Sequence, residues 1–362
     1  MITSATGVYR YSTRGIAKYS GEVMRIEFVL AALLTLVSPL AAQAVPPSQD
    51  VLAKAQEALD HDRPADALAL LQPLASIQPP IKGVQHELGL VYYRTGKLAE
   101  AQSAFASAIK QDASDQESVQ LEGLVLYRLG RPADAIPYLE RVQQWLPGAN
   151  TDATYVLGLC YLNAQRYDDA RASFAAQYGL APDSAGAYLL LAKMLKRANL
   201  TELAAVQAQK ALSASPNMPL AHFMLGEIAL TQSNIDQAIV ELQAEQRLDP
   251  AYAPLYDRLG DAYLHQDKLE QAQQALIKAI ALDTSMTSSF TRMGEVLMRR
   301  HDLRTAILYL KHAETMDPDD PVIHTLLSQA YHRTGQDDDA RRENDLASKI
   351  HASKVLNLDP GK

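Results

Sequence analysis

Histidine pairs are the residues of this chain whose spacing could bind a metal ion. His86-Glu87 begins like the HExxH zinc motif, but no second histidine follows four residues after the first. His324 and His332 are eight residues apart and could lie near one face of a helix. Their places in the repeat described below predict one packing residue and one surface residue instead. We therefore predict no metal site.

An acidic run and a single cysteine complete the set of chemically suggestive residues. Asp337-Asp338-Asp339 falls where a helix is expected to begin, and the helix dipole stabilises negative charge there. Cys160 is the one cysteine, which excludes an intramolecular disulfide and a CxxC pair, and we expect it to be buried in a helix. The sequence has no glycine-rich phosphate loop and no GxSxG motif. We predict no catalytic residue, no cofactor and no enzyme activity.

The net charge of the chain argues against one class of partner, the nucleic acids. Asp and Glu number 42 against 34 Lys and Arg, and the formal net charge is -8. Binding to a nucleic-acid backbone needs a dense basic face, so we predict no nucleic-acid partner. Hydrophobic residues make up 48% and aromatic residues 6%. This composition suits helices that pack closely through small side chains better than a β-sandwich.

A recurring alanine reveals the elements that organise the chain. It stands at Ala67, Ala101, Ala135, Ala170, Ala204, Ala238, Ala272, Ala306 and Ala340, at intervals of 34 residues with one interval of 35. Such a period is typical of a repeat array, in which each unit buries its apolar face against its neighbours. We predict nine units over residues 48–354: 48–81, 82–115, 116–149, 151–184, 185–218, 219–252, 253–286, 287–320 and 321–354. The extra residue lies within 147–150.

Each unit has the pattern of two helices. Apolar residues at unit positions 4, 7, 8 and 11 form one helix face, and those at positions 20, 24 and 27 form another. A turn is expected near position 15, where Gly96, Gly130 and Gly335 stand. Position 8 is small in every unit, so we expect the two helices to approach closely there. Gln177 and Glu245 replace alanine at position 27 and are expected at the helix surface.

These residues resemble the tetratricopeptide repeat family. The family pattern has a large residue at position 4, Leu-Gly at 7 and 8, Tyr at 11, Ala at 20, Phe at 24, Ala at 27 and Pro at 32. The second unit matches it with Leu88-Gly89, Tyr92, Ala101, Phe105 and Ala108. The resemblance implies an all-α, right-handed superhelical α-solenoid of helix-turn-helix units with eighteen helices. It also implies that the first helices line a concave groove that binds peptides.

The groove-facing columns define our candidate binding residues. They are apolar or aromatic in the N-terminal half, basic in the fifth unit and of mixed charge toward the C-terminus. The candidates are Leu90, Tyr93, Tyr127, Tyr155, Leu159, Lys193, Lys196, Arg197, Phe223, Asp257, Asp261, Arg292 and Glu295. In such a groove tyrosines would stack on a segment and basic residues would pair with its acids. The alternative is that these are ordinary exposed helix faces and that some tyrosines pack against the neighbouring unit.

One specialisation of the family is not supported. The carboxylate clamp that holds chaperone C-termini requires asparagine at position 9 of one unit and position 6 of the next. No unit here has asparagine at position 6, and Arg258 and Arg292 match only the last element of the clamp. A role as a heat-shock co-chaperone is therefore not predicted.

Residues 1–44 are predicted to be an N-terminal extension with a signal peptide. Arg25 precedes the apolar run Phe28 to Val37, and Ala42-Gln43-Ala44 resembles a cleavage site. We take Met24 as a candidate true start and expect cleavage after Ala44. Residues 45–47 would be a linker and 355–362 a C-terminal tail. The alternative is an uncleaved anchor, although the continuous apolar run is shorter than the roughly 20 residues of a membrane span.

The sequence thus predicts an exported, non-enzymatic scaffold, periplasmic or secreted, that binds a peptide or protein segment in the groove of its solenoid. The alternative is a substrate-recognition or assembly subunit of an envelope enzyme or secretion complex whose catalytic partner is a separate chain. The partner is a protein or peptide of unknown identity. Membrane contact is expected only through an uncleaved signal, and formation of a homo-oligomer stays open.

Overall fold

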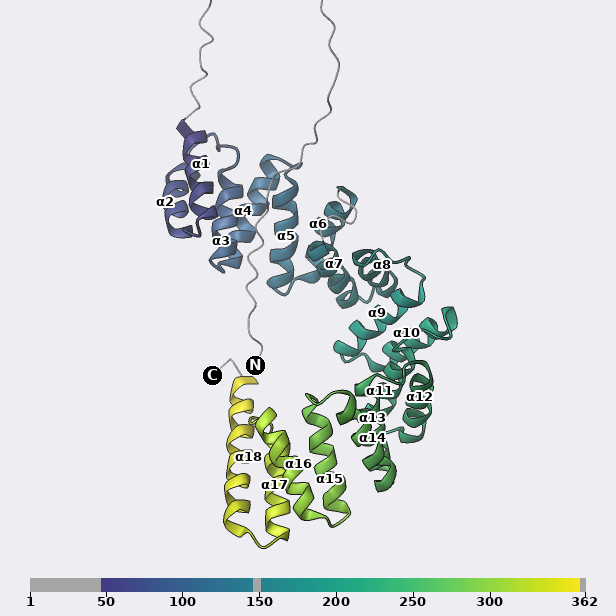
Figure 1. The fold of residues 1–362 in the computed structure, drawn as a ribbon. Coiled ribbons are helices and arrows are strands. Elements are labelled where there is room, and N and C mark those ends of the chain that lie inside the picture. Colours follow the sequence, from purple (N-terminus) through teal and green to yellow (C-terminus); the bar gives the residue numbers. More distant parts are fainter. Residues whose placement is uncertain (1–46, 146–150, 359–362) are drawn as a thin grey trace, which may run out of the picture. The chain divides into compact units, whose positions relative to one another are not determined.

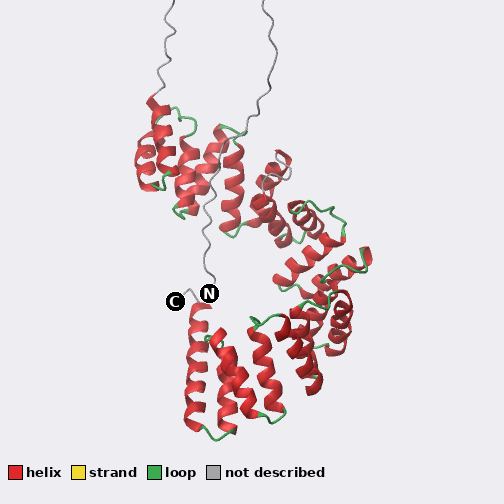
Figure 2. Ribbon diagram, in the orientation of Figure 1, coloured by secondary structure: helices red, strands yellow, loops and turns green. Residues whose placement is uncertain are grey.

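The computed structural model describes residues 47–145 and 151–358. Within these ranges the chain forms eighteen α-helices and no strand (Figures 1 and 2). This confirms the all-α fold expected from the period. The predicted signal peptide and the predicted insertion at residues 147–150 lie outside the described residues. The boundaries of the individual units stay a prediction.

The helices follow one another as antiparallel pairs joined by short turns. Their bounds are α1 (Pro47–Asp60), α2 (Pro64–Ala75), α3 (Val84–Arg94), α4 (Leu98–Gln111), α5 (Gln116–Arg128), α6 (Pro132–Trp145), α7 (Thr151–Asn163), α8 (Tyr167–Gln177), α9 (Ala185–Arg197), α10 (Thr201–Ala214), α11 (Ala221–Thr231), α12 (Ile235–Leu248), α13 (Ala253–His265), α14 (Leu269–Leu282), α15 (Thr287–Arg299), α16 (Leu303–Met316), α17 (Pro321–Arg333) and α18 (Asp337–Leu358). Each helix packs against the next, and most odd-numbered helices also contact the next odd-numbered one. The first helices of neighbouring pairs therefore form one shared surface.

In the six pairs that have glycine at position 8, the glycine is required by the side chain at position 24 rather than by the recurring alanine. A Cβ atom placed on Gly260 of α13 would lie 2.6 Å from Leu276 Cγ of α14, and one on Gly158 would lie 2.6 Å from the Phe174 ring. Both distances are far below van der Waals contact. In the fifth unit, where position 8 is Ala192, position 24 is the small Ala208. In this unit the smaller side chain at position 24 leaves room for the Cβ atom of Ala192.

The turn inside every pair adopts the same left-handed conformation. The residues at position 15 have φ between 55 and 78°: Asp62, Gly96, Gly130, Gln165, Asn199, Ser233, Asp267, His301 and Gly335. In the fourth unit Arg166 N then donates to Tyr161 O at 2.8 Å, the bond that closes a Schellman motif at a helix C-terminus. The turn predicted from three glycines is therefore present in all nine pairs, although six of them lack glycine.

Replacing Gln165 by glycine is expected to stabilise the protein by up to about 1 kcal/mol. A left-handed conformation costs a non-glycine residue about 1–2 kcal/mol, and glycine returns part of that through its larger loss of backbone entropy. Urea unfolding followed by circular dichroism measures the change. As a control, Gln271→Gly on the exposed side of α14 should destabilise by about 1 kcal/mol. Equal destabilisation by both variants would contradict the conformational argument.

The expectation that Glu245 lies at the helix surface is wrong. This side chain of α12 is 0% exposed, and its carboxylate accepts hydrogen bonds from the backbone N–H groups of Leu220 at 2.7 Å and Phe223 at 3.2 Å. Those groups lie at the start of α11, where N–H groups have no partner within the helix. Glu245 therefore caps its neighbour from inside the pair. Gln177 is partly buried rather than fully exposed.

Candidate functional site

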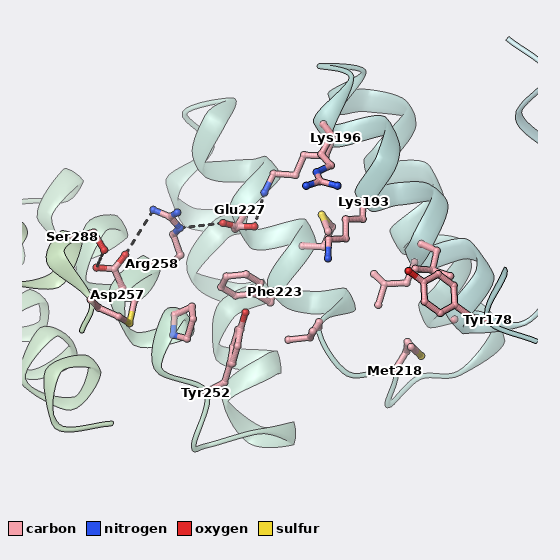
Figure 3. A pocket seen from close by; sticks show the side chains of 18 of the residues that line it. Tyr178, Lys193, Lys196, Met218, Phe223, Glu227, Tyr252, Asp257, Arg258 and Ser288 are labelled. Atoms are coloured by element: carbon pink, nitrogen blue, oxygen red, sulfur yellow. Dashed lines mark hydrogen bonds and ion pairs between the residues drawn. The ribbon is translucent and has the colours of Figure 1, made fainter. Parts of the chain in front are cut away.

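A large cavity lies over the first helices of the central units. We call it the central pocket, and its volume is about 820 Å³. It is open to solvent, and Figure 3 shows part of its lining. The lining residues come from α9, α11, α13 and α15 and from the segments that precede them: Tyr178, Leu180, Gly186, Leu189, Leu190, Lys193, Lys196, Arg197, Met218, Leu220, Phe223, Met224, Glu227, Tyr252, Pro254, Asp257, Arg258, Met286 and Ser288.

An aromatic pair forms part of the pocket wall. The rings of Phe223 and Tyr252 meet edge to face, with centroids 5.0 Å apart and an interplanar angle of 85°. Burial, and then the negative charges of Glu227 and Glu245, raise the pKa of the Tyr252 hydroxyl. The hydroxyl therefore stays protonated at neutral pH. A protonated hydroxyl beside an apolar wall can donate a hydrogen bond to a bound group.

Three cations of α9 stand at the pocket but differ in what they contact. The Lys196 ammonium pairs with Glu227 of α11. Lys193 and Arg197 are exposed, and none of the ion pairs or hydrogen bonds among the described residues involves their side chains. They lie four residues apart, on the same face of the helix. The pocket thus carries two positive charges that no described residue neutralises.

A chain of ion pairs links the first helices on one side of the pocket. Glu227 accepts from Lys196 and from Arg258, whose Nε lies 3.1 Å from Glu227 Oε1 (Figure 3). The Arg258 Nη1 also lies 3.8 Å from Asp257 Oδ2. These contacts join α9 to α11 and α11 to α13. Each carboxylate bridges two cations, so these charges are satisfied within the protein.

The chain continues to α15 through a buried aspartate. Asp257 is 2% exposed, and Arg292 Nη1 donates to its Oδ2 at 2.8 Å while the hydroxyl of Ser289 donates to Oδ1 at the same distance. Arg292 also reaches Asp261 Oδ2 at 3.3 Å. Glu295 pairs with Arg299 of its own helix at 2.9 Å. The C-terminal candidates that we predicted for ligand binding are therefore engaged with each other or with their own helix.

The N-terminal candidates are not brought to the central pocket. Tyr127, Tyr155 and Leu159 are half-buried and pack against a hydrophobic core cluster. The Tyr155 ring lies 5.8 Å from that of Phe174. Leu90 and Tyr93 pack in the same way against another cluster. These positions fit the alternative that the tyrosines pack against neighbouring helices.

Sequence reasoning missed one column of pocket residues. Met218, Tyr252 and Met286 all occupy position 34, the last residue of three consecutive units, and each lines the pocket. The preceding unit ends in Ser184, which caps α9, and the eighth ends in Asp320, which caps α17. A large apolar residue in place of a capping residue in three successive units was the signal that could have identified them.

A second cluster, in the last two pairs, combines a histidine with carboxylates. Single ligand atoms of Glu314, His324 and Glu343 lie within 4.8 Å of one another. His324 Nε2 lies 2.9 Å from the carbonyl oxygen of Pro318 and therefore donates, while Nδ1 lies 2.7 Å from Glu343 Oε2. The Glu314 carboxylate already contacts Lys311. Because Glu314 is paired with Lys311 and Glu343 is hydrogen-bonded to His324, we interpret the cluster as an internal structural contact.

The stability of the C-terminal pair of helices is expected to fall as the pH rises through the folded-state pKa of His324. Burial alone would lower this pKa, but the hydrogen bonds to Glu343 and to Pro318 O raise it above 6.5. A raised folded-state pKa means that the stabilisation is fully present below the ordinary pKa and is lost at higher pH. His324→Asn should therefore cost more stability at mildly acidic than at alkaline pH in urea unfolding. An equal loss of stability at both pH values would contradict this expectation.

None of the helices in the described ranges is both long and apolar enough to cross a membrane.

Comparison with known proteins finds several that are similar to part of this chain. A curated relative, "Cellulose synthase 1 operon protein C" from Komagataeibacter xylinus, is 26% identical over 171 residues, which are 43% of this chain and 13% of that protein. The chain thus matches only a small part of this relative's length. A solved structure of MamA is 24% identical, covers 46% of this chain and 96% of that one, and has a TM-score of 0.41. A structure of pilF from Pseudomonas aeruginosa is 20% identical, covers 59% of this chain and 93% of that one, and has a TM-score of 0.45.

Family models match most of the helical array. One model described as "Tetratricopeptide repeat" matches residues 126–194 and 297–354, and a second with the same description matches residues 86–150. A third, described as "Tetratricopeptide repeat-like domain", matches residues 161–303. Together they extend from residue 86 to residue 354 without a gap. With the paired helices and the small position-8 residues on which they pack, these matches show that the chain belongs to the tetratricopeptide repeat family.

Proposed function

We propose that this chain is a non-enzymatic scaffold that binds a linear segment of a partner protein in the central pocket. The single observation that carries the proposal is an open, largely apolar cavity of about 820 Å³ with two exposed, unpaired cations on its rim. Cavities of this size can bury several side chains of a ligand. The other charged side chains around the pocket are paired with one another, so a ligand can bind without breaking those ion pairs.

Photocrosslinking from inside the pocket tests this function. A photoreactive residue at Leu220, which lines the pocket and is 39% exposed, should label one segment of a partner that mass spectrometry identifies. The same residue at Val240, an exposed apolar position of α12 outside the pocket lining, is the matched control. Labelling should weaken when Phe223→Glu places a charge in the apolar wall. Equal labelling from both positions would rule out the pocket as the binding site.

A second candidate function is an assembly or substrate-recognition subunit of an envelope complex whose catalytic partner is a separate chain. The match to "Cellulose synthase 1 operon protein C" favours it, because that name places the relative in an operon for a polymerising enzyme. Co-purification of this chain with an envelope enzyme, lost on Phe223→Glu, would support this candidate. If the Phe223→Glu variant still co-purified with the enzyme, the complex would form without the central pocket.

We further propose that the protein is exported, periplasmic or secreted. The support is the sequence of residues 24–44, with a basic start, an apolar run and a small-x-small site. Mass determination of the protein from a fractionated cell should give an N-terminus near Val45. A chain that retains Met1 in the cytosolic fraction would be incompatible with export, and a chain that retains the apolar run in the membrane fraction would support the anchored alternative.

A further inference from the structure

We propose that the segment bound in the central pocket is acidic and amphipathic: a cluster of large apolar side chains next to two carboxylates that pair with Lys193 and Arg197. This inference rests on the proposed function and specifies the chemistry of its ligand. The apolar part would lie against Phe223, Met218 and Tyr252, and the carboxylates would lie at the rim formed by α9.

The charge of the ligand follows from which groups are already paired. The ion-pair chain from Lys196 to Asp261 contains three cations and three carboxylates and is therefore neutral. Lys193 and Arg197 lie outside it, and both line the pocket. Their spacing of four residues places the two charges one helical turn apart. A ligand with two nearby carboxylates would match both, whereas a basic segment would be repelled.

The apolar lining determines how selective the pocket is toward side-chain shape. Three methionines, Met218, Met224 and Met286, contribute to it. Methionine is unbranched and flexible and adapts to differently shaped partners. We therefore expect the pocket to accept leucine, methionine or phenylalanine at the apolar positions of a ligand. Specificity would instead come from the position of the acids relative to the apolar cluster.

Fluorescence anisotropy with synthetic peptides and the full-length protein tests the proposal. The first probe is a labelled peptide with two leucines and one phenylalanine followed by two glutamates. The others replace both glutamates by glutamine, replace both by lysine, or replace the apolar residues by serine. We expect the glutamate peptide to bind about tenfold more tightly than the glutamine peptide, with a gap that narrows at high salt. The serine peptide should not bind, and exchange of leucine for methionine should change affinity less than twofold.

A charge-reversal variant provides the decisive comparison. Lys193→Glu with Arg197→Glu should invert the preference, so that the lysine peptide binds better than the glutamate peptide. Arg304→Glu with Lys349→Glu makes the same change of net charge at exposed positions of α16 and α18 and should leave the preference unaltered. The inversion does not depend on the absolute affinity, and circular dichroism checks that both double variants remain folded.

The outcomes separate this inference from the proposed function. If glutamate and glutamine peptides bind equally and the charge reversal has no effect, the acidic ligand is wrong while the pocket remains a segment-binding site. If no apolar peptide binds and palmitate binds in a Lys193-dependent manner, both proposals fail and the pocket is a site for small anionic amphiphiles. If nothing binds and Leu220 crosslinks no partner, both proposals fail and the pocket has no ligand of either kind.

Discussion

Replacing Gly260 by leucine is expected to lower the free energy of unfolding by about 3 kcal/mol, the upper end of the usual range for overpacking. Even a Cβ atom at this position would lie 2.6 Å from Leu276 Cγ, and Leu276 is fully buried. The longer leucine side chain cannot be accommodated unless α13 moves away from α14. Because neighbouring first helices share one surface, the displacement would also disturb the contacts of α13 with α11 and α15.

Urea unfolding of the full-length protein measures the effect. Long repeat arrays often unfold in several steps, so hydrogen exchange should locate the loss of protection in α13 and α14 first. Gln274→Leu adds the same side chain at an exposed position of α14 and should change stability by less than about 0.5 kcal/mol. A double variant, Gly260→Leu with Leu276→Ala, should recover part of the loss. Unchanged stability of Gly260→Leu would contradict the close approach of the two helices.

The fold was largely predictable because it depends on local and periodic properties. A small residue at position 8 recurs in every unit and an apolar face at positions 20, 24 and 27 recurs in most of them, so each unit supports the same interpretation. The position of the turn was also predictable from three glycines, but its presence in the six units without glycine was not. Gln165 and His301 adopt the left-handed conformation without glycine because the Schellman hydrogen bond and the packing of both helices determine the backbone there.

The candidate site was predictable only in part, because its properties depend on pairing between units. The columns identified Lys193, Arg197 and Phe223 as groove residues, and all three line the central pocket. They could not show that Asp257 would be neutralised by Arg292, since that pairing depends on the offset between helices from different units. Glu245 was misplaced for the same reason: its partners are backbone groups of the preceding helix, which no side-chain pattern reveals.

Neutralising Asp257 by Asp257→Asn is expected to lower the free energy of unfolding by about 3 kcal/mol, the lower end of the cost of breaking a buried ion pair. The side chain of Asp257 is 3% exposed and that of Arg292 20%, so the arginine would be left with little solvent to replace its partner. Asp261, at 3.3 Å, retains a weaker contact with Arg292 and keeps the cost from being larger. The loss should appear in urea unfolding and in faster hydrogen exchange of α13 and α15.

A matched pair between the same two units provides the control. Asp267 Oδ1 lies 3.8 Å from Arg299 Nη1, but the aspartate side chain is 78% exposed, so Asp267→Asn should cost less than about 1 kcal/mol. Asparagine also tolerates the left-handed backbone of that turn. A double-mutant cycle with Asp257→Asn and Arg292→Gln then isolates the coupling, which should exceed that of the exposed pair. The same cycle with Asp267→Asn and Arg299→Gln measures the exposed pair. Equal coupling in the two cycles would contradict the argument that burial strengthens the Asp257–Arg292 pair.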